Sequence, residues 1–189
     1  AIKPVDAFLN LFTGKSYHVE RFISNSFRKK LIEILNQESY DIVQLETLFI
    51  SPYINTIRKY SSAKIVLRSH NIEHLIWQRV ASISRNPLKK LYLKHLARTL
   101  KKYELNILNK FDGIATITAK DGEYFRKNGC RVPMIAIPFG IDLKKFSKSR
   151  ETKVEFPSLF HIGAMNWMPN EEGMRWFLNE VWPEVHKNH

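Results

Sequence analysis

Residues 64–73, with the sequence KIVLRSHNIE, join a short β-branched run to the signals that begin a helix. The run at 64–69 is largely apolar without regular alternation, which is typical of a strand buried on both faces of a parallel sheet. Asn71 can cap the next helix, and Glu73 falls in its first turn, where a carboxylate is favourable. A strand that leads directly into a helix is the building unit of α/β domains.

Four other short runs predict strands of the same kind. Helical patterns separate most of them, and this alternation is typical of an α/β domain with a Rossmann-like parallel sheet and flanking helices. The four runs are 41–46 (DIVQLE), 113–118 (GIATIT), 134–138 (MIAIP) and 158–163 (SLFHIG).

Periodicity and capping signals predict the helices between these strands. Residues 19–37 place apolar side chains on one face, and residues 87–110 predict the longest helix. Thr118 begins a capping box, and Gly129 is the natural end of that helix. Two further helix starts rest on single caps: Ser51 before Pro52, and Asn170 before a helix that Pro183 ends.

The composition of this chain of 189 residues excludes several classes of protein. Hydrophobic residues make up 44% of it, which excludes a disordered chain. No run approaches the roughly 18 consecutive apolar residues of a membrane span. The one cysteine, Cys130, excludes a disulfide scaffold and favours the reducing cytoplasm. No HExxH motif is present and no GxGxxG follows a strand, so we expect neither a metal nor another cofactor.

The formal charge of +12 predicts an anionic partner without choosing one. In the predicted helix 87–110, basic residues recur on the face opposite an apolar one. Two interpretations stay open: contact with an anionic membrane surface on its cytoplasmic side, or a solvated helix face. Basic and aromatic residues do not interleave, which argues against a nucleic-acid partner. The basic stripe is Lys90, Lys94, Arg98 and Lys101 or Lys102, opposite Leu88, Tyr92, Leu96, Tyr103 and Ile107.

Two places in the sequence are candidates for ligand binding. His70 directly follows the predicted strand 64–69, and ligands of open α/β sheets bind beyond the carboxyl ends of strands. The alternative for His70 is a hydrogen bond to a loop carbonyl. The loop 163–166 precedes a helix whose first turn holds Glu171 and Glu172, so its backbone favours a phosphate more than the helix end does. The alternative for this loop is tight strand–helix packing at the start of a domain.

Several motifs, in their order and spacing over residues 40–183, resemble those of family-4 glycosyltransferases. They are 70–79 (HNIEHLIWQR), Tyr103-Glu104, Phe111-Asp112, 138–142 (PFGID) and 163–170 (GAMNWMPN) with Gly173. That family has the GT-B fold, in which two Rossmann-like domains face each other across a cleft. Its members transfer a sugar from a nucleotide donor to an acceptor with retained anomeric configuration and without a metal.

The resemblance implies roles for particular residues. His70 corresponds to the histidine that reaches the donor sugar and is the catalytic candidate. Gly140 lies where the chain crosses between domains, and Gly163 lies on the donor side. The implied partners are a nucleotide-sugar donor and a glycan or lipid-linked acceptor, in polysaccharide or glycolipid assembly. The predicted substrate- and donor-binding residues are Asn71, Glu73, Gly140, Gly163 and Asn166.

The resemblance also predicts the domain organisation. Residues 1–142 correspond to an acceptor-side domain that lacks its first strand or strands, 143–157 to a basic interdomain linker, and 158–189 to the first strand and helix of the donor-binding domain. We expect no transferase activity from such a chain by itself. The absent strand belongs at the centre of the sheet, where residues 158–163 or a second copy of the chain, in a homodimer, are two expected substitutes.

Two other functions stay open from the sequence. A nucleotide-sugar epimerase shares the GT-B fold and a nucleotide site but has no acceptor. A non-catalytic module would instead use the basic stripe of helix 87–110 to bind anionic surfaces.

Overall fold

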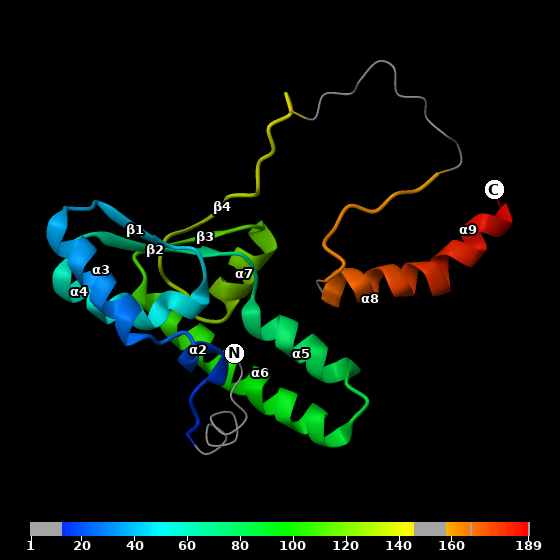
Figure 1. Cartoon of the computed structure of the whole chain (residues 1–189), viewed down its shortest axis with the longest axis horizontal. Coiled ribbons are helices and arrows are strands. Elements are labelled where there is room, and N and C mark those ends of the chain that lie inside the picture. The colour runs from blue at the N-terminus through cyan, green and yellow to red at the C-terminus, as the bar shows by residue number, and fades with distance from the viewer. Residues whose placement is uncertain (1–12, 146–157, 167, 189) are drawn as a thin grey trace. The chain divides into compact units, whose positions relative to one another are not determined.

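Four short strands form the sheet of this α/β fold: β1 (Ile42–Leu45), β2 (Lys64–Ser69), β3 (Gly113–Thr116) and β4 (Met134–Ala136) (Figure 1). All are parallel and lie in chain order, so each strand pairs with the next one. In this register Leu45 lies beside Leu67, and Leu67 beside Ile114. The computed structural model confirms the predicted parallel sheet for the four runs between residues 41 and 138.

The structure describes residues 13–145, 158–166 and 168–188, and the chain divides into two units between Gly140 and Ile141. Most of the predicted linker 143–157 therefore lies outside the described residues. The helices of the first unit are α2 (Tyr17–Glu20), α3 (Asn25–Gln37), η1 (Leu48–Tyr53), α4 (Ile54–Tyr60), α5 (Glu73–Ile83), α6 (Pro87–Ile107), η2 (Leu108–Lys110) and α7 (Ala119–Lys127).

The helices of the first unit lie on one side of the sheet (Figure 1). Side chains alternate along a strand, and Leu45, Leu67 and Ile114 on the covered face belong to the main core. On the other face Ile42 and Ile135 are exposed. The prediction of strands buried on both faces is therefore wrong for β1 and β4 as the structure describes them. A short apolar run does not tell which of its two faces another element will cover.

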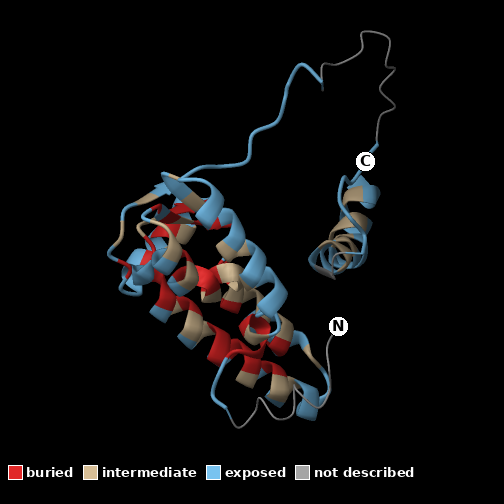
Figure 2. Ribbon diagram, turned by 60° about the vertical axis from the view of Figure 1, so that its left-hand side comes forward, coloured by how far each residue is buried: buried red, intermediate tan, exposed pale blue. Residues whose placement is uncertain are grey.

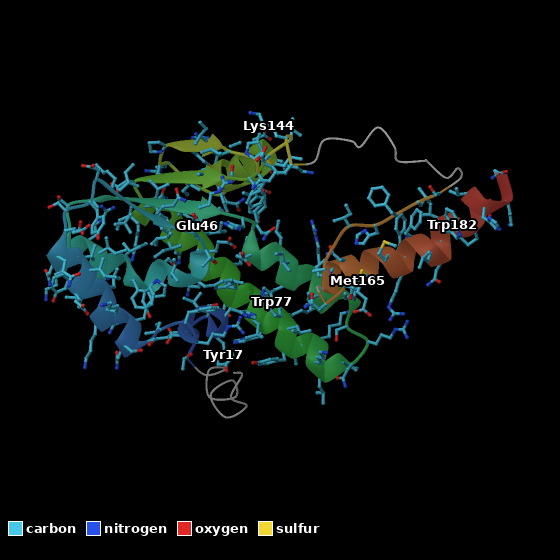
Figure 3. The ribbon with its side chains drawn as sticks, turned by 45° about the horizontal axis from the view of Figure 1, so that its top comes forward. Tyr17, Glu46, Trp77, Lys144, Met165 and Trp182 are labelled. Carbon is cyan, nitrogen blue, oxygen red and sulfur yellow. The ribbon has the colours of Figure 1, made fainter. Side chains whose placement is uncertain are left out.

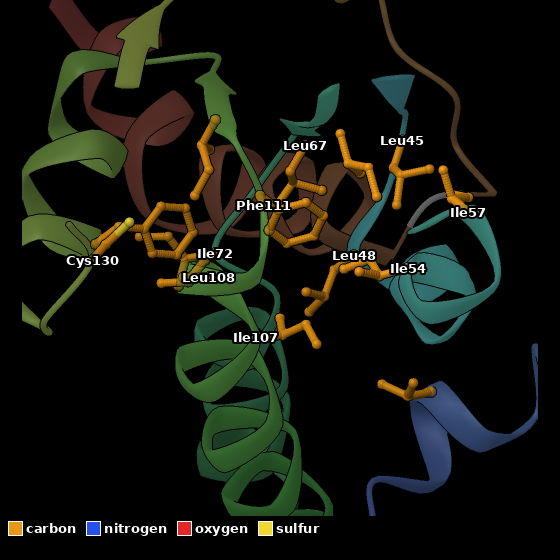
Figure 4. Packing of buried hydrophobic residues seen from close by; sticks show 14 of the residues in the cluster. Leu45, Leu48, Ile54, Ile57, Leu67, Ile72, Ile107, Leu108, Phe111 and Cys130 are labelled. Carbon is orange, nitrogen blue, oxygen red and sulfur yellow. The ribbon is translucent and has the colours of Figure 1, made fainter. Parts of the chain in front are cut away.

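The main core fills the layer between the covered sheet face and helices α4, α6 and α7. Figure 4 shows aliphatic side chains of strands and helices packed in one cluster, with Leu67 next to the ring of Phe111. Buried residues gather in this layer of the first unit, whereas none of the described residues of the second unit is buried (Figure 2). The hydrophobic core that holds the fold therefore belongs to the first unit.

The predicted helix 19–37 is two helices, α2 and α3, with a break before Ser24. The Ser24 hydroxyl accepts a hydrogen bond from the Phe27 amide at 3.3 Å and caps α3. A serine that bonds the backbone in this way favours a helix start over a helix interior. Tyr53 fixes the break, because its hydroxyl accepts from the Ser24 amide at 2.7 Å and donates to the Phe22 carbonyl at 2.9 Å. The apolar face predicted for one continuous helix is consequently divided, and Phe27 stays exposed.

The capping signals gave mixed results. Thr118 caps α7 by accepting from the Asp121 amide at 3.1 Å, and Gly129 follows the helix with a φ of 90°, so this prediction is confirmed. The helix start predicted at Ser51 is wrong, because the chain there forms the 3-10 helix η1 and α4 begins only at Ile54. The Ser51 hydroxyl bonds the hydroxyl of Tyr103 at 2.8 Å, and a hydroxyl engaged with α6 does not cap a helix here.

Helices α5 and α6 pack side by side as a hairpin whose turn lies at the end away from the sheet (Figure 1). Asn86 caps α6 by accepting from the Lys89 amide at 3.0 Å, and Pro87 occupies the first helical position, as the predicted helix 87–110 requires. No helix in the described part of the chain has both the length and the apolar character of a membrane span.

The second unit contains α8 (Met168–Trp176), a π-helical turn η3 (Phe177–Val181) and α9 (Trp182–Asn188). Residues 158–163 form no strand in the structure, so the predicted strand is wrong. A strand needs a partner, and this segment belongs to a separate unit. Pro183 does not end the helix either, since helical backbone continues without a break from η3 into α9, in which Pro183 is the second residue.

Candidate functional site

Three loops at the carboxyl edge of the sheet bring together Glu46, His70 and Phe139. Glu46 directly follows β1 and is labelled in Figure 3, His70 follows β2, and Phe139 lies beyond β4. The His70 Nε2 atom lies 3.1 Å from a carboxylate oxygen of Glu46. The rings of His70 and Phe139 meet edge to face, with centroids 5.6 Å apart. Side chains from three separate strand ends thus converge where α/β sheets bind their ligands.

Arg68 supports this group from inside β2. Its guanidinium donates to the Thr116 carbonyl at 3.2 Å and lies 5.5 Å from the centre of the Phe139 ring. The side chain is buried, so the guanidinium positions the ring by a cation–π contact while a strand carbonyl satisfies one of its donors. We call Glu46, Arg68, His70 and Phe139 the strand-end site.

The chemistry of the strand-end site follows from its one carboxylate–imidazole pair. A carboxylate only accepts hydrogen bonds, so Nε2 of His70 carries a proton, and Nδ1 can accept a hydrogen bond whenever the ring is neutral. Hydrogen bonds from Gln44 and then His70 lower the pKa of Glu46, which keeps this acceptor ionised. The His70 side chain is 39% exposed, so a ligand can reach it. The pair can orient a hydroxyl group, accept its proton, or stabilise positive charge nearby.

A buried network behind the site holds the start of α5. Glu104 of α6 accepts from the backbone amides of Glu73 and His74 at 3.0 and 3.1 Å. The same carboxylate lies 2.6 Å from Nδ1 of the fully buried His74, whose Nε2 is 2.9 Å from the hydroxyl of Tyr124. Asn71 does not cap α5, contrary to the prediction, because Glu104 supplies the acceptor for the first amides of the helix.

Glu73 has the most perturbed carboxyl group near the site. Burial, and then the negative charge of Glu104, raise the pKa of Glu73 from 4.5 to about 7. Between these two values the folded state binds a proton that the unfolded state does not. The stability that Glu73 contributes is therefore fully present below pH 4.5 and is lost as the pH rises through about 7.

We expect Glu73→Gln to remove this pH dependence. As the pH rises from acid to mildly alkaline, the free energy of unfolding of the variant should increase by about 1–2 kcal/mol relative to that of wild type, because Gln cannot ionise. This range allows for solvent screening. Urea unfolding across this pH range measures the difference. Glu123→Gln, on the exposed side of α7, is the control and should leave the profile unchanged. Parallel profiles for wild type and Glu73→Gln would contradict the assignment.

The structure brings only some of the predicted site residues together. His70 is at the strand-end site, whereas Asn71 is exposed beside it and contributes its carbonyl to a bond from the Ser69 hydroxyl at 3.0 Å. Gly140 follows Phe139, and a Cβ added there would meet no atom within 4 Å.

The remaining two predicted residues, Gly163 and Asn166, belong to the second unit. A Cβ at Gly163 would lie 2.5 Å from the His161 ring and 2.9 Å from the Asn170 amide nitrogen, so these two side chains would have to shift to admit it. Asn170 in turn donates to the Ala164 carbonyl at 3.1 Å and shapes the loop 163–166. Asn166 is exposed.

Sequence reasoning missed Glu46, Arg68 and the buried network. Glu46 ends the run DIVQLE, so the criterion that selected His70, a polar residue at the carboxyl end of a strand, also applies to it. Arg68 and Glu104 gave no comparable signal, because each is a charged residue whose burial depends on distant segments.

Among residues 13–145, 158–166 and 168–188, no three His, Cys, Asp or Glu side chains gather as a metal site would need. No family model, curated protein or solved structure matches this chain.

Proposed function

We propose that the first unit is the acceptor-side domain of a retaining glycosyltransferase of the GT-B type, and that its strand-end site meets the transferred sugar. The observation that carries the proposal is the position of His70. It lies exposed at the carboxyl edge of a parallel sheet, oriented by Glu46 and Phe139, and it begins the motif HNIEHLIWQR. The one cysteine, Cys130, favours the reducing cytoplasm as the place of this activity.

The side chains of the strand-end site suit a carbohydrate. A sugar presents hydroxyl groups at its edges and C–H groups on its ring faces. The imidazole of His70 can exchange hydrogen bonds with a hydroxyl, and the exposed ring of Phe139 offers an apolar surface to a ring face. A retaining transfer develops positive charge on the sugar. The ionised Glu46, which lies behind the imidazole, can stabilise this positive charge. In the second unit, Gly163 and Asn166 of the loop 163–166 remain the proposed donor-binding residues.

Saturation-transfer NMR with a panel of uridine and guanosine diphosphate sugars tests this function on the 189-residue chain. We expect the sugar-ring protons of at least one donor to receive saturation. His70→Ala should weaken that binding by roughly tenfold or more, because a hydrogen bond to a charged or polarised group is lost. His95→Ala, a histidine of α6 outside the strand-end site, is the matched control and should bind like wild type.

Two results would count against the proposal. One is a chain that binds no sugar in the panel, and the other is donor binding that His70→Ala and His95→Ala leave equally unchanged. Saturation of the nucleotide protons without saturation of the sugar-ring protons would also show that the transferred sugar does not contact the strand-end site.

A further inference from the structure

Three aliphatic side chains are exposed together around the turn of the α5–α6 hairpin. Ile83, Leu88 and Leu91 are 53%, 80% and 69% exposed, respectively. Leu88 and Leu91 line a surface hollow of about 430 Å³ with Tyr92, Lys94, His95 and Arg98. We call Ile83, Leu88 and Leu91 the hairpin tip. Leu88 was expected on the face opposite the basic stripe, yet it lies beside Lys94 and Arg98 on the exposed face of α6.

The charge around the hairpin tip has one sign. Residues 79–102 contain eight Lys and Arg residues and no Asp or Glu. Within the described parts of the chain, none of these eight cations forms an ion pair with a carboxylate. Lys90 donates to the Ser82 carbonyl at 3.0 Å, which ties the start of α6 to the end of α5 and stiffens the turn. The hairpin thus presents aliphatic side chains at its end and unpaired positive charge along its side.

We propose that the hairpin tip inserts into the interface of an anionic lipid bilayer, with Lys94, Arg98 and the neighbouring cations against the lipid headgroups. Exposed aliphatic side chains flanked by cations match an interface that is apolar below and anionic above. Each cation near an anionic surface and each buried aliphatic side chain adds to binding. A nucleic acid would contact the cations but would leave the aliphatic side chains of the hairpin tip exposed. A bilayer contacts both, so it explains more of this surface. The inference does not rest on the proposed transferase activity.

Vesicle sedimentation of the 189-residue chain tests the inference. Wild type should bind vesicles that contain phosphatidylglycerol and bind pure phosphatidylcholine vesicles much more weakly. Lys94→Glu with Arg98→Glu should lower the partition coefficient by roughly tenfold or more, because two attractive charges become repulsive. The control with the same change in net charge is Lys29→Glu with Lys120→Glu, on exposed positions of α3 and α7, and it should have a clearly smaller effect.

The aliphatic residues are tested separately at high salt, where electrostatic attraction is screened. Leu88→Ser with Leu91→Ser should reduce the remaining binding by roughly tenfold or more, while Leu143→Ser with Leu159→Ser, exposed elsewhere, should not. All four residues are exposed, and circular dichroism confirms that the variants fold. The inference is overturned if wild type does not bind anionic vesicles, or if the hairpin-tip variants bind them as well as their controls do. It is also overturned if RNA competes with the vesicles for the chain and Leu88→Ser with Leu91→Ser leaves all binding unchanged.

Discussion

Replacing Glu104 with alanine is expected to lower the free energy of unfolding of the first unit by about 3–5 kcal/mol, the usual cost of removing one partner from a buried charged network. The Glu104 carboxylate is almost fully buried and accepts three hydrogen bonds, from the amides of Glu73 and His74 and from Nδ1 of His74. Alanine would leave all three donors without an acceptor, and the fully buried His74 would keep only its bond to Tyr124.

Urea unfolding followed by circular dichroism measures this loss. The stability of Glu104→Gln should fall between those of Glu104→Ala and wild type, because the amide oxygen of Gln can still accept hydrogen bonds from some of the three donors. Glu123→Ala removes an exposed glutamate of α7 and should change stability little. Equal stabilities of Glu104→Ala and Glu123→Ala would show that the buried network does not hold the start of α5.

Asp112→Ala is expected to lower the free energy of unfolding by about 2–3 kcal/mol. This is the range for losing a hydrogen bond to a charged group when the loss leaves a buried donor unsatisfied. Asp112 accepts from the Ile65 amide at 2.7 Å and pairs with Arg58 at 2.6 Å, so it joins the start of β2 to α4. The Ile65 side chain is fully buried, and water replaces the lost acceptor poorly there.

The Asp112 prediction has a pH signature. The amide of Ile65, then the Arg58 side chain, hold the pKa of Asp112 below its usual 3.8. Its contribution is thus present above pH 3.8 and is lost as the pH falls through the lowered value. Wild type and Asp112→Ala should therefore converge in acid unfolding experiments. Asp41→Ala, an exposed aspartate just before β1, is the control, and a difference between wild type and Asp112→Ala that does not shrink in acid would argue against this account.

Local signals predicted the elements whose stabilising contacts are local. The Thr118 cap, the start of α6 at Pro87 and the four strands between residues 41 and 138 follow from short stretches of sequence. The predicted strand at 158–163 and the helix start at Ser51 failed, because a strand needs a distant partner and the Ser51 hydroxyl has a distant one in Tyr103. Such contacts join residues that are far apart in sequence, so no single segment predicts them.

The motifs of the resemblance have different physical roles in the structure. Glu104 of the Tyr103-Glu104 pair holds the start of α5, and Asp112 of the Phe111-Asp112 pair holds the start of β2. Both motif residues therefore support the scaffold, and only His70 among the three lies where a ligand can reach it. Its partner Glu46 is 24 positions away in sequence, and the contact between the two side chains depends on the pairing of β1 with β2.

The central claim is that the imidazole of His70 contacts the sugar of an activated donor. The ring resonances of His70, followed during the donor titration proposed above, test it most directly. The account predicts that the His70 and Phe139 ring signals shift with sugar concentration and saturate together, while the His95 signals stay in place and the free nucleoside diphosphate alone has no such effect. A donor that saturates the chain without moving the His70 signals would contradict the claim.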